Sequence, residues 1–170
     1  MSLEEYREKI VGWGVDRNLF CPHNGSNICR QLTKTLEEIG ELAGGICRGN
    51  NDIVIDSIGD IYVTLVLAQK MIGGEMKLFS LDCEKSTFSA LANFMHTYGK
   101  LVYHVDPDNN ERVNNISTCN NLINNAMVEL QVLAEVYGLS FDACVKRAWN
   151  EIKHRKGEMR NGIFIKEEDL

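Results

Sequence analysis

The sequence predicts an all-α protein, an antiparallel bundle of about five to six helices. Only two prolines, Pro22 and Pro107, occur in its 170 residues, so long stretches lack the residue that most reliably ends a helix. Four segments repeat apolar residues at intervals that alternate between four and three, the period of helices packed along a shallow seam. This length suits one ordinary domain, so we expect residues 1–170 to form a single all-α domain.

Composition and charge exclude several classes of protein. With 44% hydrophobic and 25% charged residues, the chain has the composition of a folded protein. The net charge of −6 argues against a nucleic-acid partner, which needs a basic surface. The longest apolar run, Ile61–Ala68, is too short to cross a membrane. The N-terminus resembles no export signal and the cysteines form no CxxC pair, so we predict a cytoplasmic protein with no membrane partner.

The first predicted helix runs from Ser2 to Gly12. An irregular, Gly- and Asn-rich stretch from Gly12 to Gly25 follows it and contains Trp13. An aromatic side chain in such a loop is a candidate for stacking on a nucleotide base, and also a candidate for a plug in the core.

Two long helices come next, separated by Gly49-Asn50-Asn51. Ser26 and Asp52 are their candidate N-caps. The second helix is rich in β-branched residues, but it keeps the helical period over about 20 residues, which decides for helix over strand. The residues that recur with this period are Ile28, Leu32, Thr35, Ile39, Leu42 and Ile46, then Val54, Ile58, Ile61, Leu65, Ala68 and Ile72.

The same period predicts further helices from Phe88 to Val105 and from Ile116 to Tyr137. A last helix is expected from Ser140 or Phe141 to Lys156, before a charged tail. The four long helices then form two hairpins of one bundle.

A degenerate internal repeat is one hypothesis for these two hairpins. Aligning Leu91, Gly99 and Leu101 with Leu32, Gly40 and Leu42 sets the two helices in register. The second hairpin then has neutral or basic residues where the first has carboxylates. The replaced pairs are Glu37 and His96, Glu38 and Thr97, Glu41 and Lys100, and Asp60 and Asn125. Chance likeness between heptad-like helices is the alternative.

Five carboxylates on the first hairpin are the candidate functional residues. They are Glu37, Glu38, Glu41, Asp56 and Asp60. Glu38 and Glu41 share one helical face, and so do Asp56 and Asp60. In a hairpin that turns near Asn50, we expect Glu41 to lie opposite Asp60, so that three carboxylates converge.

A cation would stabilise this group. Asp60 lies between Gly59 and Ile61-Tyr62-Val63 on a helix that is apolar almost all round, so we expect it to be partly buried. A desolvated carboxylate facing others is costly unless a cation neutralises them. Oxygen ligands without His or Cys suit Mg²⁺ or Mn²⁺. Because bound Mg²⁺ normally also takes substrate phosphates, a polyphosphate such as a nucleotide is the expected substrate.

This pattern resembles the MazG-like all-α nucleoside triphosphate pyrophosphohydrolases, relatives of the dimeric dUTPases. Their signature is EExxE, a spacer, and then ExxD on the next helix, and Glu37-Glu38-Ile39-Gly40-Glu41 with Asp60 fits it. The stretch from Ala148 to Gly157 is similar to the C-terminal NEIKxRKG segment of some members. The chain departs at one place: the Glu of ExxD falls on Ser57, and the nearest acid is Asp56.

The resemblance implies an enzyme that cleaves a nucleoside triphosphate, with a leaning towards deoxynucleotides, to the monophosphate and pyrophosphate. Such enzymes act in nucleotide-pool control or house-cleaning, and as homo-oligomers, dimers or tetramers. The implied metal ligands of Mg²⁺ are Glu38, Glu41, Asp56 and Asp60. Glu37 or Asp56 would complete the site or accept the proton of the attacking water. The implied catalytic set is Glu37, Glu38, Glu41 and Asp60.

Seven residues are candidates for binding substrate. Gln31 and Lys34 share the helical stripe of Glu38, although Lys34 is equally well explained as an ion-pair partner of Glu38. The basic C-terminal residues would neutralise pyrophosphate, and stabilisation of a last helical turn is the alternative reason for them. The full set is Trp13, Gln31, Lys34, Asn150, Lys153, Arg155 and Lys156.

Other functions stay open from the sequence. A ferritin-like di-metal bundle needs two ExxH motifs, and only Glu151-Ile152-Lys153-His154 qualifies. A non-catalytic helical interaction module with a relic metal site would explain both Ser57 and the carboxylates missing from the second hairpin. Cleavage of phosphoribosyl-ATP, by a related helical fold, is the substrate alternative.

Overall fold

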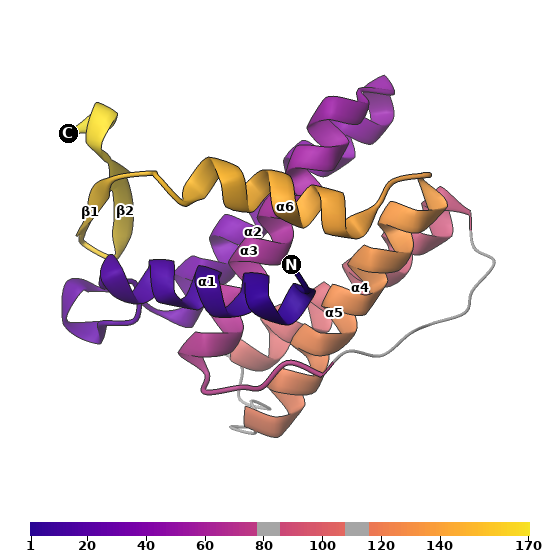
Figure 1. Cartoon of the computed structure of the whole chain (residues 1–170). Coiled ribbons are helices and arrows are strands. Elements are labelled where there is room, and N and C mark those ends of the chain that lie inside the picture. Colours follow the sequence, from indigo (N-terminus) through magenta and orange to yellow (C-terminus); the bar gives the residue numbers. More distant parts are fainter. Residues whose placement is uncertain (78–85, 108–115) are drawn as a thin grey trace.

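The computed structural model describes residues 1–77, 86–107 and 116–170 (Figure 1). This described part contains six α-helices, two short 3-10 helices and one two-stranded sheet, so the all-α prediction is confirmed. The elements are α1 (Leu3–Asp16), η1 (Pro22–Asn24), α2 (Ile28–Arg48), α3 (Asn51–Met71), α4 (Thr87–Val105), α5 (Ile116–Val136), α6 (Phe141–Ile152), β1 (Gly157–Arg160), β2 (Ile163–Lys166) and η2 (Glu167–Asp169).

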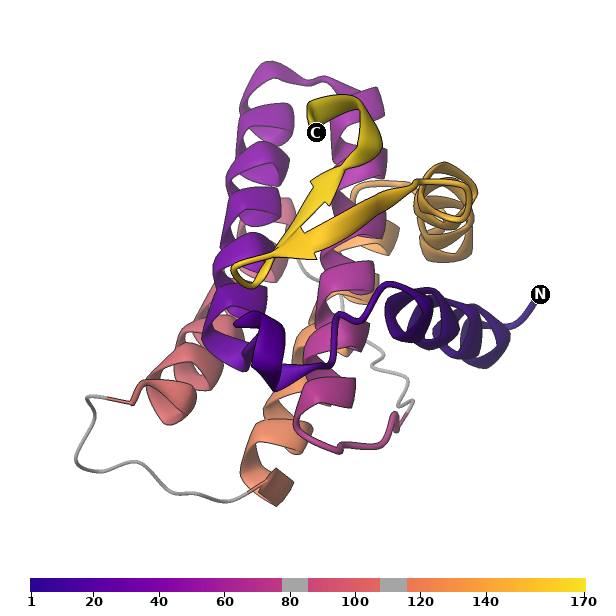
Figure 2. The same ribbon diagram turned by 90° about the vertical axis from the view of Figure 1, so that its left-hand side faces the viewer.

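Helix α3 is the centre of the fold. Its residues from Ile61 to Gln69 are all buried, which explains why its sequence is apolar on nearly every face. Helices α2 and α5 pack on it as bundle neighbours. Helix α2 lies on one side of α3, and α1 and α6 cover the other (Figure 2).

A two-residue turn joins α2 to α3. Gly49 adopts the left-handed conformation (φ 61°) that glycine tolerates best, and this ends α2. The N–H of Asn50 donates to the carbonyl of Gly45 at 2.9 Å, and the Asn50 side chain accepts from the N–H of Ile53 at 3.3 Å. Asn50 therefore closes one helix and caps the next.

The helix caps differ from the predicted ones. Asn27 caps α2, with its side chain accepting from the N–H of Arg30, and Asn50 caps α3. The predictions of Ser26 and Asp52 were therefore wrong by one and two positions. The cause is that Asn accepts the same backbone hydrogen bond as Ser or Asp, and an Asn lay close to each predicted cap.

The second hairpin, α4–α5, packs against the first. The Tyr98 hydroxyl donates to the carbonyl of Leu32, and the Cys29 thiol donates to the carbonyl of Val105 at 3.8 Å. Since Cys29 precedes Leu32 and Val105 follows Tyr98, α2 and α4 run antiparallel. The bundle is thus made of α2, α3, α4 and α5.

The N-terminal helix is longer than predicted. Helix α1 continues to Asp16, so Trp13 lies on a helix and not in the predicted loop. The continuation is stabilised by packing, because Trp13 and Gly14 are both buried and a Cβ on Gly14 would lie 2.9 Å from Leu67 of α3. Tertiary contact here overrides the local glycine signal.

The C-terminal region also differs from the prediction. Helix α6 ends at Ile152 rather than at Lys156, and the predicted charged tail forms the β1–β2 hairpin. Its two-residue turn, Asn161-Gly162, has positive φ angles of 52° and 79°. An Asn-Gly pair beside apolar residues is a known hairpin signal, which the prediction missed.

Within the described residues, no helix combines the length and the apolar character needed to cross a membrane.

Candidate functional site

The first part of the site is a row of charged residues on α2. The ammonium of Lys34 lies 2.8 Å from a carboxylate oxygen of Glu37 and 2.8 Å from one of Glu38. Glu37 and Glu41 are exposed, whereas Glu38 is buried. Burial raises the pKa of Glu38 above its ordinary value. Lys34 lowers this pKa, and the negative charges of Glu41 and Glu37 raise it further. Glu38 is therefore the desolvated carboxylate of this row.

Glu38 lies on the line of α2 that faces α3. The Gln31 amide, seven residues earlier, donates to the carbonyl of Thr64 on α3 at 3.1 Å. Seven residues later, a Cβ on Gly45 would lie 2.9 Å from Ile53 of α3. Because residues seven apart lie almost in line on a helix, Glu38 must also face α3.

Asp60 is the carboxylate of α3 at the same place. Burial is the main reason that the pKa of Asp60 is raised to about 7. The nearby carboxylates also raise it, in the order Glu38, Asp56 and Glu151, and the charge of Arg155 lowers it. At neutral pH this carboxyl group is therefore about half protonated. A positive charge placed here would stabilise its ionised form.

The register across the hairpin differs from the prediction. We expected Glu41 to lie opposite Asp60, but Glu38 is the α2 residue among the strongest influences on Asp60. Glu41 acts on Glu38 from a more exposed position, three residues along the helix. The reason is the rotation of α2 about its axis. The line of Gln31, Glu38 and Gly45 faces α3, and Glu41 lies about 60° away from that line around the helix.

Gly59 brings a third helix to Asp60. A Cβ on Gly59 would lie 2.4 Å from the carbonyl oxygen of Cys144 and 2.8 Å from the Cβ of Ala148. No other residue lets α6 approach α3 so closely. This approach accounts for the effect of Glu151, at the end of α6, on Asp60.

The end of α6 supplies both charges of an ion pair. A guanidinium nitrogen of Arg155 lies 2.5 Å from a Glu151 oxygen. The carbonyl of Arg155 accepts two hydrogen bonds from Arg17, at 2.9 and 2.7 Å. Arg17, which follows α1, therefore fixes the backbone of Arg155, whose positive charge lowers the pKa of Asp60. Arg155 itself lies beyond α6, the helix in which it was expected.

Asp56 is held by another residue of α6. The Nε of Arg147 lies 3.2 Å from an oxygen of Asp56, and a second nitrogen lies 3.4 Å from Asp52. Ser57, where ExxD has Glu, is buried, and its hydroxyl has no hydrogen-bond partner among the described residues. Arg147 therefore neutralises the charge of Asp56 at this turn of α3.

The other predicted substrate residues are less close to Asp60 or less accessible. Lys153 donates to Asn150 at 2.8 Å on the outside of α6, and Lys156 is exposed at the start of the β-hairpin. Trp13 has only 8% of its surface exposed, with the ring of Phe164 at 5.6 Å and the guanidinium of Arg17 at 4.6 Å. Stacking of Trp13 on a base would require one of these two neighbours to move.

Three residues of the site were not among the predicted ones: Arg17, Arg147 and Glu151. The signal for two of them is the spacing of four residues between Arg147 and Glu151, which places both on one face of α6. No sequence signal identifies Arg17, because its bond to Arg155 joins residues 138 positions apart.

The donor set fits a hard divalent cation. Glu38, Asp60 and Asp56 offer oxygen atoms alone, and the charge of Arg155 offsets only part of the desolvation of Asp60. Within the described residues, no three His, Cys, Asp or Glu side chains are drawn together closely enough to hold a metal ion. Lys34 and Arg147 occupy the oxygens of Glu38 and Asp56 instead. Cation binding therefore requires those two side chains to turn away.

Comparison with known proteins finds a relative that matches part of the chain. A stretch of 69 residues is 36% identical to an uncharacterised 18.2 kDa protein from the rep-hol intergenic region of Haemophilus phage HP1 (strain HP1c1). The match covers 41% of this chain and 40% of the phage protein, which is less than half of each. No family model and no solved structure matches the chain.

Proposed function

We propose that this protein is a Mg²⁺-dependent nucleoside triphosphate pyrophosphohydrolase, which cleaves a (d)NTP to the (d)NMP and pyrophosphate. The observation that carries the proposal is the position of Asp60, desolvated beside Glu38 on α2 and under the influence of the Glu151–Arg155 pair at the end of α6. The resemblance of Glu37–Glu41 and Asp60 to the EExxE and ExxD signature gives the reaction. A role in control of the nucleotide pool follows from the same resemblance.

In this proposal Glu38 and Asp60 would hold the metal ion, and Glu41 would join them from its more exposed position three residues along α2. Bound Mg²⁺ offsets phosphate charge and lowers the pKa of a bound water. Glu37 or Asp56 completes the site or accepts the proton of the attacking water. Glu41 and Glu37 are exposed beside the buried Glu38, so a substrate can reach them from solvent.

The basic residues exchange partners when substrate binds. Lys34 and Arg147 pair with Glu38 and Asp56 in the structure, and both side chains would have to leave these carboxylates before the carboxylates could hold a cation. The freed ammonium and guanidinium, together with Arg155, can then pair with phosphate oxygens. Lys153 and Lys156 lie farther out and neutralise the pyrophosphate as it leaves.

Glu151 supplies charge that Ser57 does not. The resemblance implies an acid at position 57, but Ser57 carries none, and Glu151 is one of the three carboxylates that act on Asp60. Replacing Glu151 by Gln should therefore weaken Mg²⁺ binding, measured as a smaller rise in melting temperature with Mg²⁺.

The test is release of pyrophosphate with Mg²⁺ across a panel of ribo- and deoxynucleoside triphosphates. We expect wild-type turnover that yields the monophosphate, and a loss of about 100-fold or more in Glu41→Gln and Asp60→Asn. Glu8→Gln, the same chemical change on the exposed surface of α1, is the matched control and should stay fully active.

A second candidate is the non-catalytic interaction module with a relic metal site. The pairing of Lys34 with Glu37 and Glu38, and of Arg147 with Asp56, favours it, because carboxylates satisfied in this way need no cation. If folded wild-type protein neither releases pyrophosphate nor gains melting temperature with Mg²⁺ or Mn²⁺, this second candidate replaces the first.

A further inference from the structure

The β1–β2 hairpin lies next to the carboxylate site. Figure 2 shows it in front of the middle of α2 and α3. Glu38 and Asp60 are each close to the middle of their helix. The hairpin also begins two residues after Arg155, whose charge acts on Asp60. Side chains on its inner face can therefore reach a substrate that lies against these carboxylates.

Contacts at both ends hold the hairpin in place. At its base, the N–H of Glu167 donates to the carbonyl of Lys156 at 3.0 Å. At its tip, a Cβ on Gly162 would lie 2.2 Å from the carbonyl oxygen of Gly25, so only glycine allows this contact. The strands therefore present their side chains from a fixed frame.

The pairing of the strands divides the hairpin into an inner and an outer face. Met159 lies opposite Phe164, and two residues along, Lys166 lies opposite Gly157. Residues that lie opposite each other, or two apart on one strand, share a face of the sheet. Met159 and Phe164 pack against the core, and the ring of Phe164 lies 5.6 Å from that of Trp13. Lys166 is therefore on the inner face.

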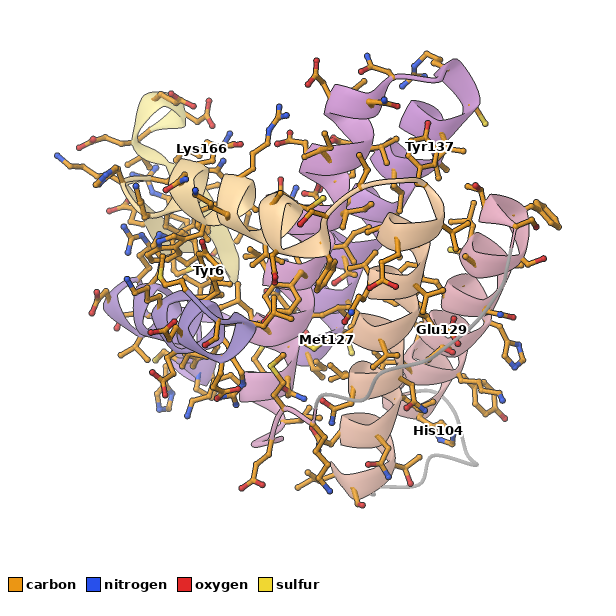
Figure 3. The ribbon with its side chains drawn as sticks, turned by 45° about the vertical axis from the view of Figure 1, so that its right-hand side comes forward. Tyr6, His104, Met127, Glu129, Tyr137 and Lys166 are labelled. Atoms are coloured by element: carbon orange, nitrogen blue, oxygen red, sulfur yellow. The ribbon has the colours of Figure 1, made fainter. Side chains whose placement is uncertain are left out.

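Lys166 lies close to the basic end of α6. Figure 3 shows it beside that end of the helix. Its backbone is about 5 Å from that of Gly157, which is two residues after Arg155. Its ammonium lies 3.9 Å from a Glu168 oxygen, a long and exposed pair that contributes little. Lys34, by contrast, is held by two carboxylates at 2.8 Å. Lys166 can therefore turn towards an incoming anion with little loss.

We propose that Lys166 is a further substrate-binding residue, which pairs with the terminal phosphate of the nucleoside triphosphate. This inference rests on the proposed function. Arg155 is among the main charges that act on Asp60 and Lys166 is not, so Lys166 is farther from that carboxylate. A cation placed there suits the phosphate that is farthest from the cleaved bond. The resemblance points instead to Lys156, which precedes Gly157 and is exposed.

The test is binding of inorganic pyrophosphate with Mg²⁺ to the full-length protein by calorimetry, beside pyrophosphate release from the nucleotide panel. Lys166→Gln should weaken pyrophosphate binding and raise KM, each about 10-fold or more, because a charged hydrogen bond is lost. The value of kcat should change less, since this bond is made equally to bound substrate and transition state.

Three further variants sharpen the test. Lys166→Arg keeps the charge and should retain most of the binding. Lys156→Gln should lose less than Lys166→Gln, because Lys156 lies on the outer face. Lys9→Gln, the same chemical change on the exposed surface of α1, is the matched control and should bind as wild type does. Circular dichroism checks that each variant is folded.

The outcomes separate this inference from the proposed function. If wild type is active and folded Lys166→Gln binds pyrophosphate and substrate unchanged, the inference is overturned and the proposed function stands. A larger loss in Lys156→Gln than in Lys166→Gln also overturns the inference. If wild type is inactive with every nucleotide, the proposed function fails. Pyrophosphate binding that depends on Lys166 would then still support a phosphate site under the hairpin, and its absence would overturn both proposals.

Discussion

The hairpins α2–α3 and α4–α5 share a frame but differ in chemistry. In both, the first helix has a fully buried leucine and, two residues before it, an exposed glycine with open space around its Cα. In both, the second helix is followed by a glycine with positive φ. The matching residues are Leu42 and Leu101, Gly40 and Gly99, and Gly73 and Gly138. The internal-repeat hypothesis was built on these same pairs, and it stays a prediction.

The difference lies where a third element meets each hairpin. Gly59 of α3 has room for the backbone of α6, which desolvates Asp60. The aligned residue of α5 is Asn124, a buried amide that accepts from Gln69 at 3.1 Å and donates to the carbonyl of Glu75 at 3.0 Å. Its neighbour Asn125 is exposed. The desolvation of Asp60 therefore depends on the glycine beside it as well as on its own place in the helix.

The largest expected effect is that of closing the gap at Gly59. Gly59→Ala places a methyl group against the Cys144 carbonyl, so α6 must move. We expect the free energy of unfolding, measured with urea, to fall by about 2–3 kcal/mol. Gly99→Ala, on the exposed face of α4 with no atom near its Cβ, is the matched control and should gain about 0.5–1 kcal/mol. Equal effects at both glycines would contradict the close contact of α3 and α6.

Removing the charge of Asp60 should stabilise the protein. At pH 8 without metal, Asp60→Asn should raise the free energy of unfolding by about 2 kcal/mol, because a neutral amide avoids the cost of a desolvated charge. The control is Asn125→Asp on α5, which adds a charge at the exposed matching position and should change stability by less than about 0.5 kcal/mol. Stabilisation by Asp60→Asn together with loss of activity would identify a functional charge kept at a cost in stability.

The same carboxyl group predicts how stability depends on pH. Its pKa in the folded state, about 7, is above its unfolded value of 3.8, so between these values the folded protein binds more protons. Stability without metal should therefore be greatest below about pH 4 for this group, fall by at least about 2 kcal/mol between pH 4 and pH 7, and level off above pH 7. The difference between wild type and Asp60→Asn isolates this group from the four histidines. A difference that does not change with pH would show that Asp60 titrates normally.

The smallest expected effect concerns the contact between the hairpins. Tyr98→Phe removes the hydroxyl that donates to the Leu32 carbonyl and leaves a buried acceptor, which should cost about 1 kcal/mol in urea unfolding. Tyr62→Phe is the comparison, since its hydroxyl donates to the carbonyl of Leu3 at 3.2 Å, within the other half of the fold.

The sequence alone determined the four long helices and their apolar faces. The 4-3 spacing of residues such as Leu32 and Ile39 sets which side of a helix is buried, because 3.6 residues complete each turn. It also determined that Glu38 and Asp60 belong to one group, since both lie near the middle of adjacent helices joined by a short turn. These features are local, or depend on one two-residue connection.

Only the tertiary structure decided what covers each face. Trp13 lies on a helix because α3 and Phe164 pack around it. The charge of Arg155 acts on Asp60 because Gly59 admits α6 and Arg17 binds the Arg155 carbonyl. The choice of Glu38 over Glu41 as the α2 carboxylate acting on Asp60 depends on a small rotation of α2. The physical reason is that periodicity fixes the direction of a side chain relative to its own helix, whereas desolvation and pairing depend on neighbours distant in the chain.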